Sequence, residues 1–143
     1  MSNTTIAEIR TYTINDGLLD SYLRLYNQQI VPNHRKYGIH VLGAWVDRAK
    51  NQVTWIRTFE SLDERKAKLD RYEVSPERDA VFPIAAFHMA KAEVKVLENV
   101  FQPSAQPENG PLTDDTARQA MAAMQAQDPA QFAKLKASTA APR

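Results

Sequence analysis

Two histidines stand where an imidazole could transfer protons. His34 continues the apolar face of a predicted helix one turn after Ile30, and His88 lies on the apolar face of a second predicted helix. Histidine titrates near neutral pH, so either side chain could act as general acid or base in a cleft between helices and sheet. The alternative for each is a buried neutral imidazole with one good hydrogen bond. The third histidine, His40, begins a predicted strand and is expected to be exposed.

Two arginines on predicted strands, Arg10 and Arg57, could anchor an anionic ligand. A guanidinium group binds a carboxylate or phenolate through a charge-assisted hydrogen bond. Arg10 also has a simpler partner, because Glu8 lies two residues away on the same face of its strand. Both charges could then belong to an ion-pair network across a dimer.

Aromatic side chains could wall a pocket for a flat organic molecule, since such pockets combine apolar walls with a few orienting polar groups. The candidates for ligand contact are Tyr12, Tyr37, Trp45 and Trp55, beside Arg10 and Arg57. The alternative is that these rings fill the core or a dimer interface.

The residues do not predict a metal site. The chain has no cysteine, no His-x-His or His-Glu-x-x-His pattern, and no carboxylates clustered with its histidines. We therefore predict no metal and no cofactor.

The overall composition of the chain argues against nucleic acid and membrane as binding partners. The chain has 143 residues, a formal net charge of +1 and 43% hydrophobic residues, enough for a core but without a strong pull toward nucleic acid or membrane. Strand aromatics lack the basic and glycine residues of an RNA-binding sheet. No apolar run approaches the roughly 20 residues of a membrane-spanning helix, and no signal peptide is evident. We expect a cytoplasmic protein that binds no nucleic acid and does not span a membrane.

Periodicity predicts the elements that would position these residues. Ile6–Ile14 alternates as a strand, and a helix from Leu18 to the region of Gly38 should bend at Pro32. The remaining predicted elements are a hairpin of strands 39–49 and 53–59, a helix from Ser61 to about Tyr72, a helix starting at Ser75-Pro76, and a strand 92–101.

This order is the βαββαβ pattern of a ferredoxin-like α+β fold, with an antiparallel sheet in the order 4-1-3-2 and the helices on one face. The first strand is then central. The uncovered face keeps large apolar groups, so we expect a homodimer that pairs two sheets. Glu8, Arg10 and Tyr12 would face either the partner sheet or the ligand cleft, and the partner sheet is favoured.

The composition changes at Gln102. We predict one domain over residues 1–101, followed over 102–143 by a Pro/Ala-rich linker and a short helical tail. Gln102 to Pro111 forms the linker, and helices should start at Thr113 and Asp128.

Four short patterns between Ile6 and Phe101 resemble the NIPSNAP family, within the dimeric α/β-barrel superfamily. The opening pattern E-[LI]-R-x-Y-x-[LI] is present as Glu8, Ile9, Arg10, Tyr12 and Ile14. The end of the long helix matches at Pro32, Arg35, Lys36 and Gly38, and the next strand at Val41, Leu42, Gly43 and Trp45. The fourth pattern comprises Asn51, Gln52, Val53, Phe59, Glu60, Ser61, Leu62, Glu64 and Arg65.

The resemblance implies a homodimer with a ligand cleft between sheet and helices in each subunit. Relatives in the superfamily include cofactor-free monooxygenases, lactone isomerases, dehydratases and haem enzymes, so haem held by His88 stays an alternative. We expect a protein that acts on or binds a small organic molecule, aromatic or carboxylate. As an enzyme it would be a metal-free isomerase, lyase or cofactor-independent monooxygenase; the alternative is a non-catalytic homodimeric binding or scaffold protein.

Overall fold

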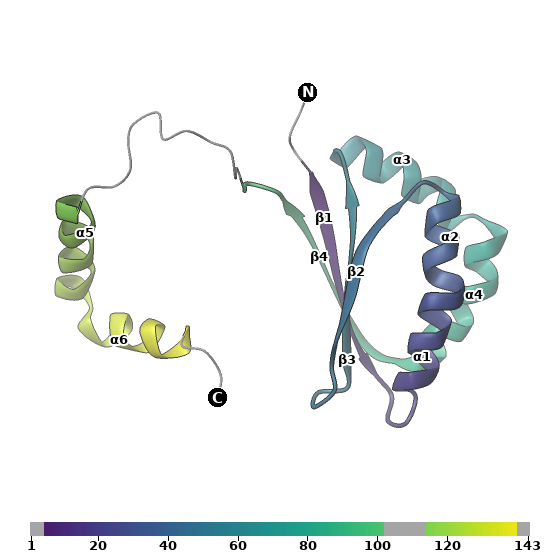
Figure 1. Cartoon of the computed structure of the whole chain (residues 1–143), viewed down its shortest axis with the longest axis horizontal. Coiled ribbons are helices and arrows are strands. Elements are labelled where there is room, and N and C mark those ends of the chain that lie inside the picture. Colours follow the sequence, from purple (N-terminus) through teal and green to yellow (C-terminus); the bar gives the residue numbers. More distant parts are fainter. Residues whose placement is uncertain (1–4, 102–113, 140–143) are drawn as a thin grey trace. The chain divides into compact units, whose positions relative to one another are not determined.

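The computed structural model describes residues 5–101 and 114–139 (Figure 1). The chain divides into two compact units, Met1–Phe101 and Gln102–Arg143, and each is described by itself. The predicted linker from Gln102 to Pro111 and the predicted cap at Thr113 lie outside the described residues.

The first unit is a four-stranded sheet with helices on one face (Figure 1). Its elements are β1 (Ile6–Ile14), α1 (Leu19–Leu25), the π-helical turn η1 (Tyr26–Ile30), α2 (Val31–Lys36), β2 (His40–Asp47), β3 (Gln52–Phe59), α3 (Leu62–Glu73), α4 (Pro76–His88) and β4 (Met89–Glu98). The strand order is β2-β3-β1-β4 and each neighbouring pair is antiparallel. This confirms the ferredoxin-like α+β fold with β1 in the centre. The last strand begins and ends three residues earlier than predicted.

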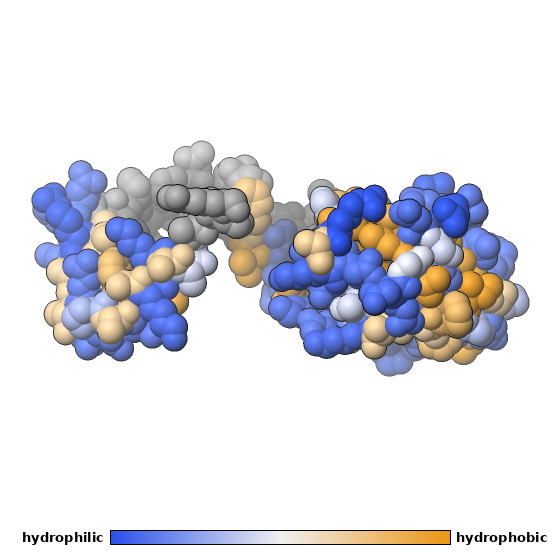
Figure 2. Space-filling model, turned by 90° about the horizontal axis from the view of Figure 1, so that it is seen from below, coloured by the Kyte–Doolittle hydropathy of each residue, from blue (hydrophilic) through white to orange (hydrophobic). Residues whose placement is uncertain are grey.

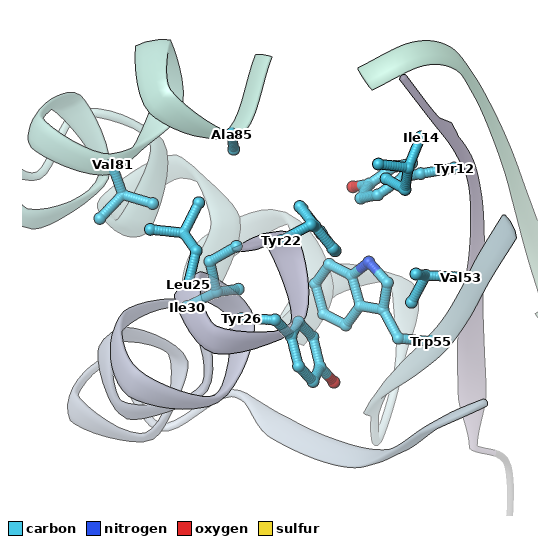
Figure 3. Close-up of a cluster of buried hydrophobic side chains, with 10 residues drawn as sticks. All are labelled: Tyr12, Ile14, Tyr22, Leu25, Tyr26, Ile30, Val53, Trp55, Val81 and Ala85. Carbon is cyan, nitrogen blue, oxygen red and sulfur yellow. The ribbon is translucent and has the colours of Figure 1, made fainter. Parts of the chain in front are cut away.

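The core lies between the sheet and the helices. Strand β3 buries every second residue, Val53, Trp55, Arg57 and Phe59, and the antiparallel register sets these beside Tyr12, Arg10, Glu8 and Ile6 of β1. Figure 3 shows Tyr12 and Trp55 extending from the strands toward Tyr22 and Tyr26 of the first helical segment.

The first long helix bends as predicted, through a π-helical turn just before Pro32. Val31 donates its N–H to the carbonyl of Tyr26, five residues back. Proline has no N–H and its ring crowds the preceding turn, so the wider π turn relieves that crowding. The helix ends at Lys36, and Gly38, two residues later, has a φ of 71° that suits glycine. The N–H groups of Gly38 and Ile39 bond to the carbonyls of Arg35 and His34, which is a Schellman motif.

Serine caps start both later helices. The Ser61 hydroxyl accepts from the Glu64 N–H at 3.0 Å, and Ser75 accepts from the Arg78 N–H at 3.1 Å. The Glu64 carboxylate reaches back to the N–H of Glu60, one residue before the cap. These caps fix where α3 and α4 begin, and α4 continues through Pro83 to His88.

The sheet face turned away from the helices keeps apolar side chains at the surface. Trp45, 55% exposed, pairs in register with Thr54, whose side chain points opposite to that of buried Trp55. Gly43 lets the indole lie along this face, because a Cβ there would sit 3.1 Å from Cη2 of Trp45. Figure 2 shows apolar side chains reaching the surface of this unit between polar ones.

The second unit contains α5 (Asp114–Gln127) and α6 (Pro129–Ser138). Asp128 caps α6 by accepting from the N–H of Gln131 at 2.9 Å, as its sequence predicts. In neither unit is any described helix long and apolar enough to cross a membrane.

Candidate functional site

Glu8 is the centre of a buried ion network within one chain. Its carboxylate has no exposed surface and accepts hydrogen bonds from Arg57 Nη2 at 2.7 Å, Arg65 Nε at 2.9 Å and Arg10 Nη1. Burial raises the pKa of Glu8, but the hydrogen bonds and charges of Arg57 and Arg10 outweigh it and hold this pKa below its ordinary value. The carboxylate is therefore ionised and fully engaged.

This network corrects the favoured orientation of the first strand. Glu8, Arg10 and Tyr12 do not point toward a partner sheet; they lie on the helix side with Trp55 and Arg57, their partners in register. The residues on the other face of β1 are small or apolar and need no ionic partner. Strand alternation alone fixed that these three residues share a face, but not which layer covers it.

His34 is held as a neutral acceptor. Its Nδ1–H donates to the carbonyl of Ile30 at 2.8 Å, so Nε2 carries the lone pair and accepts from Arg57 Nη1 at 2.9 Å. Burial, and to a smaller degree the Arg57 charge, lowers the pKa of His34 to about 4. Both ring nitrogens are used, which ties the first helix to β3.

A cavity of about 430 Å³ opens beside this network, between the sheet and the helices. That volume falls within the range of small-molecule sites. Strands β1 and β3 contribute Arg10, Tyr12, Trp55 and Arg57, and the helices contribute Tyr22, Ile30, His34, Tyr72, Val81 and Ala85. The lining also includes Glu73, Arg78, Phe82 and Lys91, none of which is buried. The walls are mostly aromatic and aliphatic (Figure 3).

Several residues that line this cavity carry a donor without a protein partner. Trp55 Nε1, Tyr22 Oη and Arg57 Nε are buried without a hydrogen-bond partner. Tyr12 Oη accepts from Arg10 Nε at 2.5 Å, which leaves the hydroxyl hydrogen of Tyr12 available. Burial raises the pKa of Tyr22, so its hydroxyl keeps its proton at neutral pH. These donors are therefore protonated and have no acceptor among the described residues.

The structure brings together five of the eight predicted site residues: Arg10, Tyr12, His34, Trp55 and Arg57. The other three, which are Tyr37, Trp45 and His88, do not border this cavity. Tyr37 donates to Glu77 at 2.7 Å, and Trp45 lies on the opposite face of the sheet. As proton carriers, His34 and His88 stay predictions.

His88 does not fit the haem alternative. Its Nδ1–H donates to the carbonyl of Ile84 at 2.7 Å, and its Nε2 lies 2.8 Å from the Ser21 hydroxyl, which donates to it. An axial ligand needs a free ring nitrogen facing the cofactor, and both nitrogens of His88 are used within the fold. No described group of three histidines and carboxylates could hold a metal ion either.

Sequence reasoning missed three residues of the site. Tyr22 lay on the predicted apolar face of the first helix, but nothing marked its hydroxyl as unpartnered. Arg78 and Lys91 were not singled out, because their approach to the cavity depends on how α4 and β4 fold back onto β1.

The fold and the cavity together define a ferredoxin-like α+β protein with a pocket between sheet and helices that is lined by aromatic, aliphatic and charged side chains. The family model named NIPSNAP matches residues 7–100, so the chain belongs to the NIPSNAP family. No curated protein matches the chain.

Solved structures agree with this fold. An uncharacterized NIPSNAP domain protein from Burkholderia xenovorans is 21% identical, with a TM-score of 0.62 over 71% of this chain and 98% of that one. A NIPSNAP family protein of unknown function from Agrobacterium tumefaciens is 24% identical, with a TM-score of 0.63 over 69% and 92%. A putative antibiotic biosynthesis monooxygenase from Nitrosomonas europaea is 8% identical, with a TM-score of 0.55 over 71% and 94%. At these identities the likeness concerns the fold alone.

Proposed function

We propose that this NIPSNAP protein binds a small organic molecule, aromatic or carboxylate, in the cavity between sheet and helices. The observation that carries the proposal is the cavity itself, whose lining includes Trp55 and Tyr22, two residues that each bury a donor, Nε1 and Oη, without a protein partner. A buried donor without a partner costs about 1–3 kcal/mol. A ligand that accepts hydrogen bonds from these donors offsets that cost.

The wall chemistry supports a flat ligand. Trp55, Tyr12 and Tyr22 all line the cavity, and the ring of Tyr12 meets those of Tyr22 and Trp55 edge to face at centroid distances of 6.0 and 6.4 Å. Rings in such contacts pack rigidly and form a firm wall for a planar molecule. Val81 and Ala85 of α4 supply aliphatic surface to the same cavity.

We propose binding rather than catalysis because His34 has no nitrogen free to exchange protons. If the protein is an enzyme, it would be a metal-free isomerase, lyase or cofactor-independent monooxygenase, and His34 would first have to release Arg57. The second candidate is a non-catalytic homodimeric binding or scaffold protein. A cytoplasmic location stays a prediction from composition.

The homodimer is also a proposal. It is supported by the apolar face that carries Trp45, Ile9 and Ile56, which no helix of the first unit covers (Figure 1). Sedimentation velocity on the full chain should show a species of twice 16.2 kDa. Trp45→Asp, which places a charge on this face, should shift it to the monomer. A monomeric wild type would contradict the proposal.

A cavity-filling substitution tests the binding site. We expect Ala85→Phe, which projects a ring into the cavity, to weaken binding of a two-ring probe such as 2-naphthoate by tenfold or more in calorimetry. Ala80→Phe is the matched control, because Ala80 lies on the same helix, is exposed and does not border the cavity. Equal affinities in the two variants, or no binding of any aromatic probe to the wild type, would contradict the proposed site.

A further inference from the structure

We infer that the ligand is an aromatic monoanion whose carboxylate binds at Arg10 and the Tyr12 hydroxyl. This inference rests on the proposed function, which describes the ligand as aromatic or carboxylate. We infer that one molecule has both properties. The observations that carry it are an ion network short of negative charge and a guanidinium with unused donors at the cavity wall.

The charge shortage lies in the Glu8 network. Three guanidinium groups, those of Arg10, Arg57 and Arg65, share one carboxylate, and His34 beside them is neutral. The cluster therefore carries two uncompensated positive charges. Arg57 is buried and the side chains of Arg10 and Arg65 are 23% and 28% exposed, so water screens this excess charge only in part and the cluster stabilises an anion placed next to it.

Arg10 is the member of the network that can reach such an anion. A guanidinium has five N–H donors, and Arg10 spends one on Glu8 and one on Tyr12 within the described part of the chain. Arg10 borders the cavity, and its Cζ lies 5.6 Å from the ring centroid of Tyr12 and 5.8 Å from that of Trp55. Arg57 is more deeply buried and is already committed to Glu8 and His34.

The Tyr12 hydroxyl adds a second donor at the same place. Arg10 Nε donates to its oxygen, which turns the hydroxyl hydrogen away from Arg10. The remaining Arg10 N–H groups and this O–H can together serve the two oxygens of one carboxylate.

The other charged residues of the cavity lining support the same sign of ligand charge. Arg78 stacks on Phe82, with its Cζ 4.0 Å from the ring centroid, and has no carboxylate partner among the described residues. Lys91 pairs with Glu93 at 2.8 Å. Glu73 is the one carboxylate among the described residues that border the cavity, against four cationic side chains. The charges along the lining therefore favour an anionic ligand.

The wild-type protein gives the first test, with two probes of equal shape. Calorimetry should give a Kd for 2-naphthoate at least tenfold lower than for the neutral 2-naphthamide. 2-Naphthyl phosphate is the third probe, and we expect it to bind more weakly than the carboxylate. Equal affinity for acid and amide, or tighter binding of the phosphate, would overturn the inference and leave the proposed cavity intact. If none of the three probes binds, both proposals fail.

Variants locate the anion. Arg10→Met should remove the preference for the acid while the affinity for the amide stays within about threefold. Arg65→Met is the matched control, because Arg65 also pairs with Glu8 but does not border the cavity, so the preference should persist. If Arg10→Met does not fold, Arg10→Lys is the substitute. It keeps the charge but loses the planar guanidinium with its several N–H donors, so the preference for the acid should fall but not vanish. A preference that survives in Arg10→Met or disappears in Arg65→Met overturns the assignment.

Discussion

Arg57 Nη1 donates a hydrogen bond of 2.9 Å to His34 Nε2, and this bond joins strand β3 to helix α2. Because Nδ1–H of the same ring is held by the Ile30 carbonyl, the imidazole can accept from Arg57 only while it is neutral. The folded state thus depends on His34 staying unprotonated.

Protonation of His34 should destabilise the fold at mildly acidic pH. Burial lowers the pKa of His34 from its ordinary value of 6.5 to about 4, so the unfolded chain takes up this proton first as the pH falls. The contribution is present in full above pH 6.5 and is lost progressively toward pH 4, on the order of 3 kcal/mol in total. Urea unfolding of the wild type should show this loss, and His34→Gln, which cannot titrate, should show a flatter dependence.

A ¹⁵N NMR titration of the imidazole is the accompanying control. It should report the Nδ1–H tautomer at neutral pH and no protonation above pH 5. Identical pH dependence of unfolding in the wild type and His34→Gln, or a ring that titrates near 6.5, would contradict the assignment.

Removal of the Glu8 charge should be among the most destabilising single changes in the first unit. In Glu8→Gln three guanidinium groups keep their charge with no carboxylate between them, so we expect a loss of about 3 kcal/mol or more in the free energy of unfolding. Glu93→Gln is the control on the same sheet, since its ion pair with Lys91 is exposed and should matter far less. If the denaturant midpoints fall equally in both variants, the Glu8 network does not stabilise the fold more than an exposed ion pair, which contradicts this prediction.

Substitutions of two tyrosines should distinguish an effect on ligand binding from an effect on stability. Tyr22 and Tyr26 both bury a hydroxyl without a partner, but only Tyr22 borders the cavity. Burial also raises the pKa of Tyr26 to about 12, so both hydroxyls are neutral. Removing either hydroxyl gives up no protein hydrogen bond, so Tyr22→Phe and Tyr26→Phe should each change the free energy of unfolding by less than about 1 kcal/mol.

Ligand affinity should distinguish the same two variants. Tyr22→Phe should weaken the binding of 2-naphthoate by roughly tenfold or more, the lower end of one hydrogen bond to a charged group, and Tyr26→Phe should leave this affinity unchanged. The check is calorimetry on both variants beside the wild type. An equal loss in both would show that the Tyr22 hydroxyl does not contact the ligand.

Much of the fold could be predicted because local patterns agreed with one another. Strand alternation at Ile6–Ile14, the caps Ser61 and Ser75, and the stop at Gly38 each have a local physical cause, and the structure confirms them. The order of elements then left one common topology. The bend near Pro32 was also predictable, but its form as a π-helical turn was not.

The site was harder because its key contacts join residues far apart in the chain. The sequence displays Glu8 next to Arg10, and this local pair suggested an ion pair at a dimer interface. The decisive partners, Arg57 and Arg65, lie on another strand and another helix, and only the sheet register brings them to Glu8. For the same reason the apolar face of the predicted helix indicated that His34 points inward, but it could not show that Arg57 donates a hydrogen bond to its Nε2.

The central claim is that an aromatic carboxylate binds in the cavity beside Trp55. The chain has two tryptophans, so ¹H–¹⁵N spectra contain two indole signals, and Trp45→Phe assigns them. Titration with 2-naphthoate should shift the Trp55 indole signal saturably while that of Trp45, on the opposite face of the sheet, stays in place. A shift of the Trp45 signal alone, or no shift of Trp55 at saturation, would contradict the account.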